Sequence, residues 1–295
     1  YLNLVFASYF RTIYVSELDE SITNLWFYAI LLAMTIFVLF VIRAVIKVGS
    51  TCNQVCNAPF VEVGCGKCFL YGGTAPNIRR AHTACHFSAE IHGAYAILIS
   101  TDLESAIQVL PTTTDNKTRY VWTGINDLLL ERNQSRVGWR AVNADLKDVV
   151  VQIPDDKWLP GEPTSGDTLM LQTDGKSYKL HTSELFPMQY DGHVVCQLVS
   201  DATVKRHTES SRMTQFSKTY PVSVTEFFGD NKDHFWKMSV AKSLGECALT
   251  CKKMLICRAI YFHPDDYDCI QTVYVDSRLA RSLQKTGWIR FGRIF

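Results

Sequence analysis

Ten cysteines, gathered into clusters, constrain this chain of 295 residues more than any other feature. They are Cys52, Cys56, Cys65 and Cys68, then Cys85, then Cys196, and then Cys247, Cys251, Cys257 and Cys269. An even number in tight clusters is typical of a disulfide framework in an oxidising compartment. The length suggests two modules. A net charge of +1 gives no electrostatic reason to expect a nucleic-acid partner.

Near the beginning of the chain, residues 21–42 carry no charged side chain. A helix of that length would span about 33 Å, which is enough for the hydrocarbon core of a bilayer. Trp26 and Tyr28 near one end, and Arg43 and Lys47 near the other, are typical interfacial anchors. A buried core helix or a signal sequence is the alternative, but no small-residue cleavage site is present after it. We therefore predict a single transmembrane helix within residues 21–48.

The orientation of this helix rests on two opposing arguments. The basic residues of its C-terminal flank favour a cytoplasmic location for the rest of the chain, whereas the cysteines favour an oxidising one. We give the cysteine argument more weight and expect residues 50–295 to be extracellular or lumenal. Two sequons, at Asn116 and Asn133, are candidate glycosylation sites in that case. Residues 1–20 are expected to be a juxtamembrane segment that lies in the membrane interface or packs on neighbouring structure.

The remainder of the chain divides by its hydrophobic pattern. Between residues 50 and 200, short alternating runs such as AYAILIS, RYVWTGI and DVVVQI predict strands. APNIRRAHTACHFSAEIHG and DLESAIQVL have helical periodicity, so the predicted fold class is α+β. Residues 201–218 are polar and are expected to be a linker. Residues 219–295 form a second domain with four cysteines of its own.

An ordered series of motifs runs through residues 50–200. It begins with CNAPFVEVGCGKCFLY and AHTACHFSAEIHGAYAILIS, and continues with WTGI at Trp122, KWLPGEP at Trp158 and the closing Cys196. In this order the motifs resemble a C-type lectin-like domain along almost its whole length. The resemblance implies the fold of that family and a non-catalytic recognition function.

The same resemblance implies two disulfides in this part of the chain, the whole-domain bond Cys85–Cys196 and the hairpin bond Cys56–Cys68. Cys52 and Cys65 then remain, and by elimination we expect them to pair with each other. The alternative is a zinc site made of the four clustered thiolates. The family's usual inner disulfide is absent, because Thr168 stands where its first cysteine belongs.

The resemblance also implies a ligand loop in the stretch DKWLPGEPTSGD. In sugar-binding relatives the glutamate of the Glu-Pro step is one of six to eight oxygen ligands of calcium. Here the motif is Glu-Pro-Thr in place of Glu-Pro-Asn, and the relatives' later Trp-Asn-Asp segment is absent. We therefore expect no cofactor, with a degenerate calcium site at Glu162 as the alternative. The candidate loop residues are Trp158, Glu162, Pro163, Thr164 and Asp167.

The second domain carries the stretch SLGECALTCKKMLICRAIYFHPDDYDCIQ. Two cysteines one helical turn apart, a third before an aromatic strand and a fourth after a turn resemble the PAN/apple family. That resemblance implies the disulfides Cys247–Cys269 and Cys251–Cys257 in a small module, and a size of this kind needs such bonds.

Motifs for catalysis are absent from the sequence. It contains no His-Glu-x-x-His, no Gly-x-Ser-x-Gly and no phosphate-binding Gly-Lys-Ser/Thr. His82, His86 and Glu90 would share one face of the first helix, and we expect that face to be solvated rather than metal-binding. We predict that the chain is not an enzyme.

The predicted function is therefore recognition or adhesion by a single-pass membrane protein that binds an extracellular protein or glycan without calcium. One alternative is an auxiliary subunit that packs against a larger membrane complex such as a channel or transporter. A second alternative is a calcium-dependent carbohydrate-binding lectin.

Overall fold

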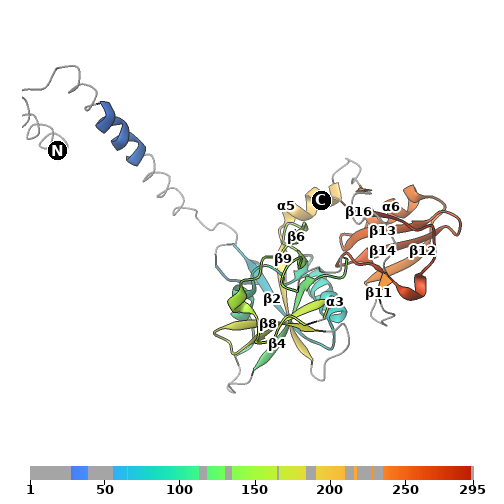
Figure 1. The fold of residues 1–295 in the computed structure, drawn as a ribbon, viewed down its shortest axis with the longest axis horizontal. Coiled ribbons are helices and arrows are strands. Elements are labelled where there is room, and N and C mark those ends of the chain that lie inside the picture. Colours follow the sequence, from blue (N-terminus) through green and yellow to red (C-terminus); the bar gives the residue numbers. More distant parts are fainter. Residues whose placement is uncertain are drawn as a thin grey trace, which may run out of the picture. The chain divides into compact units, whose positions relative to one another are not determined.

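The computed structural model describes eleven residues near the N-terminus and most of the chain after residue 55. The described ranges are 28–38, 56–64, 66–112, 118–129, 135–164, 166–183, 191–209, 216–217, 227–228 and 235–293. The chain divides into two units, residues 1–53 and 54–295, and Figure 1 shows their elements.

In the first unit, residues 28–38 are helical and their large apolar side chains are exposed. These side chains are Tyr28, Ile30, Leu31, Leu32, Met34, Ile36, Phe37 and Val38. Most of the predicted span, residues 21–48, lies outside the described residues. Within the described part of the chain, no helix combines the length and the apolar character that crossing a membrane requires.

The second unit begins with a sheet of nine strands, into which the predicted alternating runs fall. The long strands β2 and β9 pair antiparallel, and β4 lies on the other side of β9. β3 also pairs with β9, and β7 joins β4 to β8. The strands are β1 Val61–Glu62, β2 Cys68–Ala75, β3 Tyr95–Leu98, β4 Arg119–Asn126, β5 Arg140–Val142, β6 Asp148–Val150, β7 Thr168–Thr173, β8 Tyr178–Ser183 and β9 Gly192–Val199.

Two helices accompany this sheet, α3 (Ile78–Glu90) and α4 (Leu103–Ile107). Asn77 caps the start of α3. Its side-chain oxygen accepts a hydrogen bond from the Arg80 amide at 2.9 Å, which satisfies a backbone donor that has no partner within the helix. Apolar residues of α3 then enter one core with Trp122 of β4. A second core with Trp139 and Trp158 lies beneath the candidate ligand loop.

The C-terminal part of the unit forms a five-stranded sheet in the order β10-β16-β13-β14-β12 and a two-stranded parallel sheet of β11 and β15. One helix, α6 (Leu244–Lys252), is linked to the larger sheet by disulfides. The strands are β10 Phe216–Ser217, β11 Phe227–Phe228, β12 Trp236–Val240, β13 Cys257–His263, β14 Asp268–Val273, β15 Leu279–Ala280 and β16 Ile289–Arg293, and the short 3₁₀ helices are η1 Asp155–Lys157 and η2 Arg281–Leu283.

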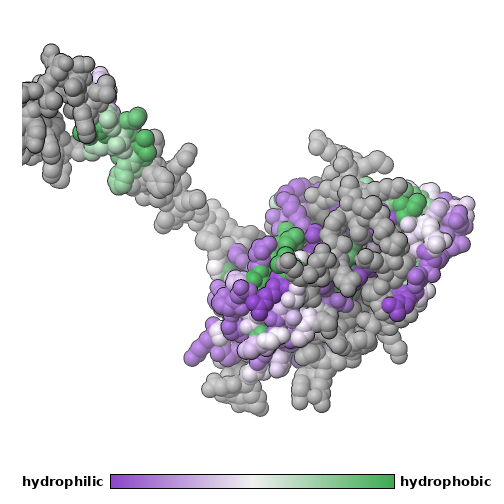
Figure 2. All heavy atoms as spheres, viewed as in Figure 1, coloured by the Kyte–Doolittle hydropathy of each residue, from purple (hydrophilic) through white to green (hydrophobic). Residues whose placement is uncertain are grey.

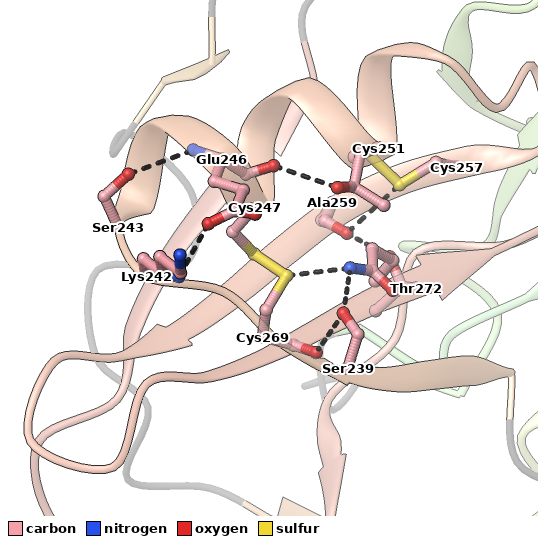
Figure 3. Close-up of a disulfide and its surroundings, with 12 residues drawn as sticks. Ser239, Lys242, Ser243, Glu246, Cys247, Cys251, Cys257, Ala259, Cys269 and Thr272 are labelled. Carbon is pink, nitrogen blue, oxygen red and sulfur yellow. Dashed lines mark hydrogen bonds between the residues drawn. A yellow bond between two sulfur atoms is a disulfide. The ribbon is translucent and has the colours of Figure 1, made fainter.

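Reciprocal capping fixes the start of α6 (Figure 3). The Ser243 hydroxyl accepts from the Glu246 amide at 3.3 Å, and the Glu246 carboxylate accepts from the Lys242 amide at 2.7 Å. This arrangement satisfies two backbone donors at once. It also orients Cys247 and Cys251 on the buried face of the helix toward the sheet.

Four disulfides are present among the described residues, and each joins a pair that the family resemblances implied. They are Cys56–Cys68, Cys85–Cys196, Cys247–Cys269 and Cys251–Cys257. The expected pair Cys52–Cys65 and the alternative zinc site include residues outside the described ranges.

The segment expected to be a linker begins with a helix, α5 (Asp201–Glu209). The Ser200 hydroxyl accepts from the Thr203 amide at 3.2 Å, and Thr203 is buried at 2% exposure. The sequence did not predict this helix, because the residue that it buries is a threonine and it has few apolar residues to give a helical pattern.

The parts on either side of that segment share a core. We call residues 56–199 the first block and residues 235–293 the second block. Phe235 and Val275 of the second block belong to the same apolar cluster as Cys85 of the first. Arg258 of β13 donates to the Leu146 carbonyl at 3.1 Å. These contacts make the two blocks one packed unit.

The prediction that His82, His86 and Glu90 share a solvated face of the helix is wrong for His82. His82 is only 7% exposed, because Tyr274 and Phe235 of the second block cover it at ring distances of 5.5 and 5.9 Å. The sequence of α3 could not reveal a partner that lies about 190 residues further along the chain.

Candidate functional site

The candidate ligand loop is anchored by Trp158. Its side chain is 4% exposed and its ring centre lies 6.1 Å from that of Trp139. Next to it, the Leu159 amide donates to the Leu180 carbonyl of β8 at 3.0 Å. The buried indole and this backbone bond hold the loop against β8, in agreement with the large area that tryptophan buries.

The next turn of the loop presents Glu162 to the same strand. Gly161 has a φ of +84°, a conformation that favours glycine. The Glu162 amide donates to the Leu159 carbonyl at 3.0 Å, and the Glu162–Pro163 peptide bond is cis. The loop backbone therefore turns back on itself and directs the Glu162 carboxylate toward Thr182.

The carboxylate of Glu162 is held by two threonines. Its Oε2 accepts from the Thr182 hydroxyl at 2.6 Å, from the Thr182 amide at 3.0 Å and from the Thr164 amide at 2.9 Å. The two threonine hydroxyls also hydrogen-bond to each other. One carboxylate oxygen thus receives three donors that all come from the chain itself.

These donors set the charge of the site. Partial burial raises the pKa of Glu162, but hydrogen bonds from the Thr182 side chain, the Thr182 amide and the Thr164 amide outweigh it. With a smaller contribution from His181, the net effect lowers the pKa below its ordinary value of 4.5. Glu162 is therefore a carboxylate at neutral pH.

We expect Thr182→Val to raise the pKa of Glu162 and to destabilise the unit by about 1 kcal/mol, since Glu162 is partly exposed to solvent. The wild-type carboxylate has the lower pKa when folded, so it stabilises the fold above about pH 4.5 and this contribution is lost as pH falls further. Urea unfolding at pH 7 and pH 4 measures both. Thr250→Val, on the exposed side of α6, is the matched control. Equal effects of the two variants would contradict the assignment.

The sequence identified Glu162 but not its main partner. No motif of the loop includes Thr182, and its register on β8, opposite Leu169 of β7, puts it beside the loop. Asp167 contributes its backbone carbonyl to the Asp127 amide at 3.0 Å. Among the residues that the structure describes, no three His, Cys, Asp or Glu side chains are grouped as metal ligands. The sequons Asn116 and Asn133 lie outside the described residues.

No family model and no curated protein matches the chain. Solved structures that match include a calcium-independent type II antifreeze protein, with 19% identity, a TM-score of 0.31 and coverage of 48% of this chain and 93% of that one. Human lithostathine matches with 17% identity, a TM-score of 0.36 and coverage of 50% and 92%. The EPNH mutant of CEL-I matches with 15% identity, a TM-score of 0.33 and coverage of 49% and 97%. These structures are C-type lectin-like domains, and each aligns with about half of the chain.

Proposed function

We propose that this chain is a recognition protein without enzymatic activity, whose first block is a C-type lectin-like domain that binds a protein or glycan without calcium. The observation that carries the proposal is that one carboxylate oxygen of Glu162, Oε2, is already held by hydrogen bonds from the chain itself. A carboxylate oxygen that already accepts three hydrogen bonds from Thr164 and Thr182 has little lone-pair capacity left for a cation.

The oxygen atoms that the loop offers also favour binding without calcium. Calcium requires six to eight oxygens, several of them charged. Thr164 and Thr182 offer neutral hydroxyls where sugar-binding relatives supply amide or carboxylate oxygens. Recognition by this loop would then depend on direct hydrogen bonds and apolar contacts with the ligand rather than on a bridging ion.

We further propose that the second block is a PAN/apple-like recognition module. A single helix linked to a small sheet by two disulfides supports this assignment. Because the two blocks share a core, they would present one continuous binding surface instead of two independent ones.

The chain is proposed to be anchored in a membrane with residues 50–295 on its extracellular or lumenal side. The uncharged stretch 21–42 supports the anchor, and Figure 2 shows hydrophobic residues along helix 28–38. The exposed aromatic rings of Tyr28 and Phe37 on that helix also suit packing on partner helices, which favours an auxiliary subunit as the second candidate function.

Calcium is expected to leave the protein unchanged. A cation with a Kd of about 1 mM would stabilise the fold by about 1.4 kcal/mol at 10 mM, whereas we expect no shift in the thermal midpoint of the detergent-solubilised full chain. Binding to glycan and protein arrays should likewise agree within about twofold in calcium and in chelator. Glu162→Gln serves as the control, since it removes the charged ligand. A calcium-dependent midpoint that this variant abolishes would establish the calcium lectin instead.

Gentle detergent extraction of the native protein, followed by size analysis and mass spectrometry, would identify the partner. A lone chain or homo-oligomer supports recognition of a ligand on another surface. Stoichiometric multi-span membrane proteins in the same particle would favour the auxiliary subunit.

A further inference from the structure

His82 is buried where the two blocks meet. It lies on α3, and its ring stacks on Tyr274 with an interplanar angle of 21° while Phe235 meets it edge-on. Its Nε2 is buried and has no hydrogen-bond partner among the described residues. The ring of His82 therefore packs against aromatic rings of the second block. Such an apolar contact favours the uncharged imidazole, because burying an unpaired charge is costly.

The charged group that acts most directly on His82 is a cation, the guanidinium of Arg258. Arg258 of β13 is fully buried and lies close enough to act on His82 electrostatically. Both residues line one small cavity whose lining includes no carboxylate. A second cavity of about 50 Å³ is also lined by Arg258, and its lining includes the carboxylates of Asp148 and Asp276.

The other titratable and charged groups around this contact are few. Tyr95 of β3 shares the small cavity, and Tyr274 shares it from the second block. His86 lies on the next turn of α3 and contacts the rings of both tyrosines. Arg79 and Glu90, also on α3, act on Tyr274. A proton on His82 would therefore face an arginine and neutral rings.

We propose that His82 is an acid-sensitive latch between the blocks: protonation of its imidazole separates the second block from α3. The neutral ring stabilises the closed unit through Tyr274 and Phe235. The charged ring needs water, which reaches it only when the second block moves away.

The direction and size of the effect are set by linkage. Burial, with a contribution from Arg258, lowers the pKa of His82 from 6.5 to about 3 in the closed unit. The open form binds the proton more tightly, so opening becomes more favourable as pH falls below 6.5 and levels off below about 3. With a pKa of 6.5 in the open form, the opening constant should rise about 25-fold from pH 7 to pH 5.

Hydrogen exchange on the detergent-solubilised full chain tests this proposal. The Arg278 amide donates to the Leu128 carbonyl across the interface at 3.0 Å, so its protection reports whether the blocks are closed. We expect that protection to fall about 25-fold between pH 7 and pH 5 after the intrinsic pH dependence of exchange is divided out. Amides of β7 and β8, inside the first block, should keep theirs.

His82→Gln should keep the interface closed at both pH values, since the amide carries no charge. His207→Gln is the matched control, because burial lowers the pKa of His207 as well but its ring nitrogen faces the Asp145 carbonyl of the first block. Acid opening that survives His82→Gln, or that His207→Gln abolishes, would overturn the proposal.

The wild-type protein gives a test that does not depend on whether the variant folds. Between pH 6 and pH 4.5, the logarithm of the opening constant should rise by about one for each unit of pH, as expected for uptake of one proton. A slope near zero would refute the latch, and equal loss of protection in β7 and β8 would show global unfolding instead.

Discussion

Replacing Cys85 and Cys196 together by alanine is expected to destabilise the unit of residues 54–295 by about 5 kcal/mol. The bond joins α3 to β9 across 111 residues, and both cysteines are 0% exposed. Losing a bond that closes so long a loop restores much conformational freedom to the unfolded chain. An effect of this size approaches the whole stability of a typical domain, so much of the double variant should be unfolded at 37 °C.

Chemical denaturation measures this effect, with the pair Cys56 and Cys68 as control. That bond spans 12 residues, and its replacement by alanines should cost about 3 kcal/mol. The expected difference of about 2 kcal/mol comes from the difference in loop length. Equal destabilisation by the two double variants would show that local packing, and not chain connectivity, accounts for the effect.

Arg258→Met is expected to destabilise the contact between the two blocks by about 2–4 kcal/mol. Arg258 donates to the Leu146 carbonyl of the first block at 3.1 Å and to the Tyr274 carbonyl at 3.2 Å. Methionine fills similar space but leaves the buried Leu146 carbonyl without this donor, at a cost of about 1–3 kcal/mol, and the partly buried Tyr274 carbonyl without its donor at a smaller cost. Relief from burying a guanidinium offsets part of the loss.

Urea unfolding, monitored by hydrogen exchange at individual amides, should show whether Arg258→Met separates the unfolding of the two blocks. We expect one unfolding transition for the wild type and two for the variant, in which the Arg278 amide loses protection before the amides of β7. Arg281→Met, on the exposed helix η2, should change stability by less than about 0.5 kcal/mol. A single transition at an unchanged midpoint would show that Arg258 does not join the blocks.

Much of the fold was predictable because local patterns and tertiary structure agree. WTGI became the core of β4, with Trp122 fully buried and its indole nitrogen donating to the Ala75 carbonyl at 2.8 Å. KWLPGEP became a loop anchored by Trp158, with Glu162 at its turn. In each case a large side chain and its neighbours fix the local geometry, and both are visible in the sequence.

The remainder depends on residues that meet only in three dimensions. Thr182 binds Glu162 because β8 pairs in register with β7, and no motif distinguishes this threonine from others. His82 has the helical spacing of a solvated residue, but Tyr274 and Phe235 of the second block pack against its ring. α5 carries too few apolar residues to give a helical pattern. Contacts of this kind arise from the packing of distant segments.

The bond between Cys85 and Cys196 also determines how the chain would transmit a pulling force. Tension applied between residue 56 and residues beyond Val199 would run through the Cys56–Cys68 bond, along β2 and α3 to Cys85, and across to Cys196. Residues 86–195 lie outside this covalent path. The Glu162 loop is therefore mechanically unloaded, so the candidate binding surface would keep its shape while the protein bears a load.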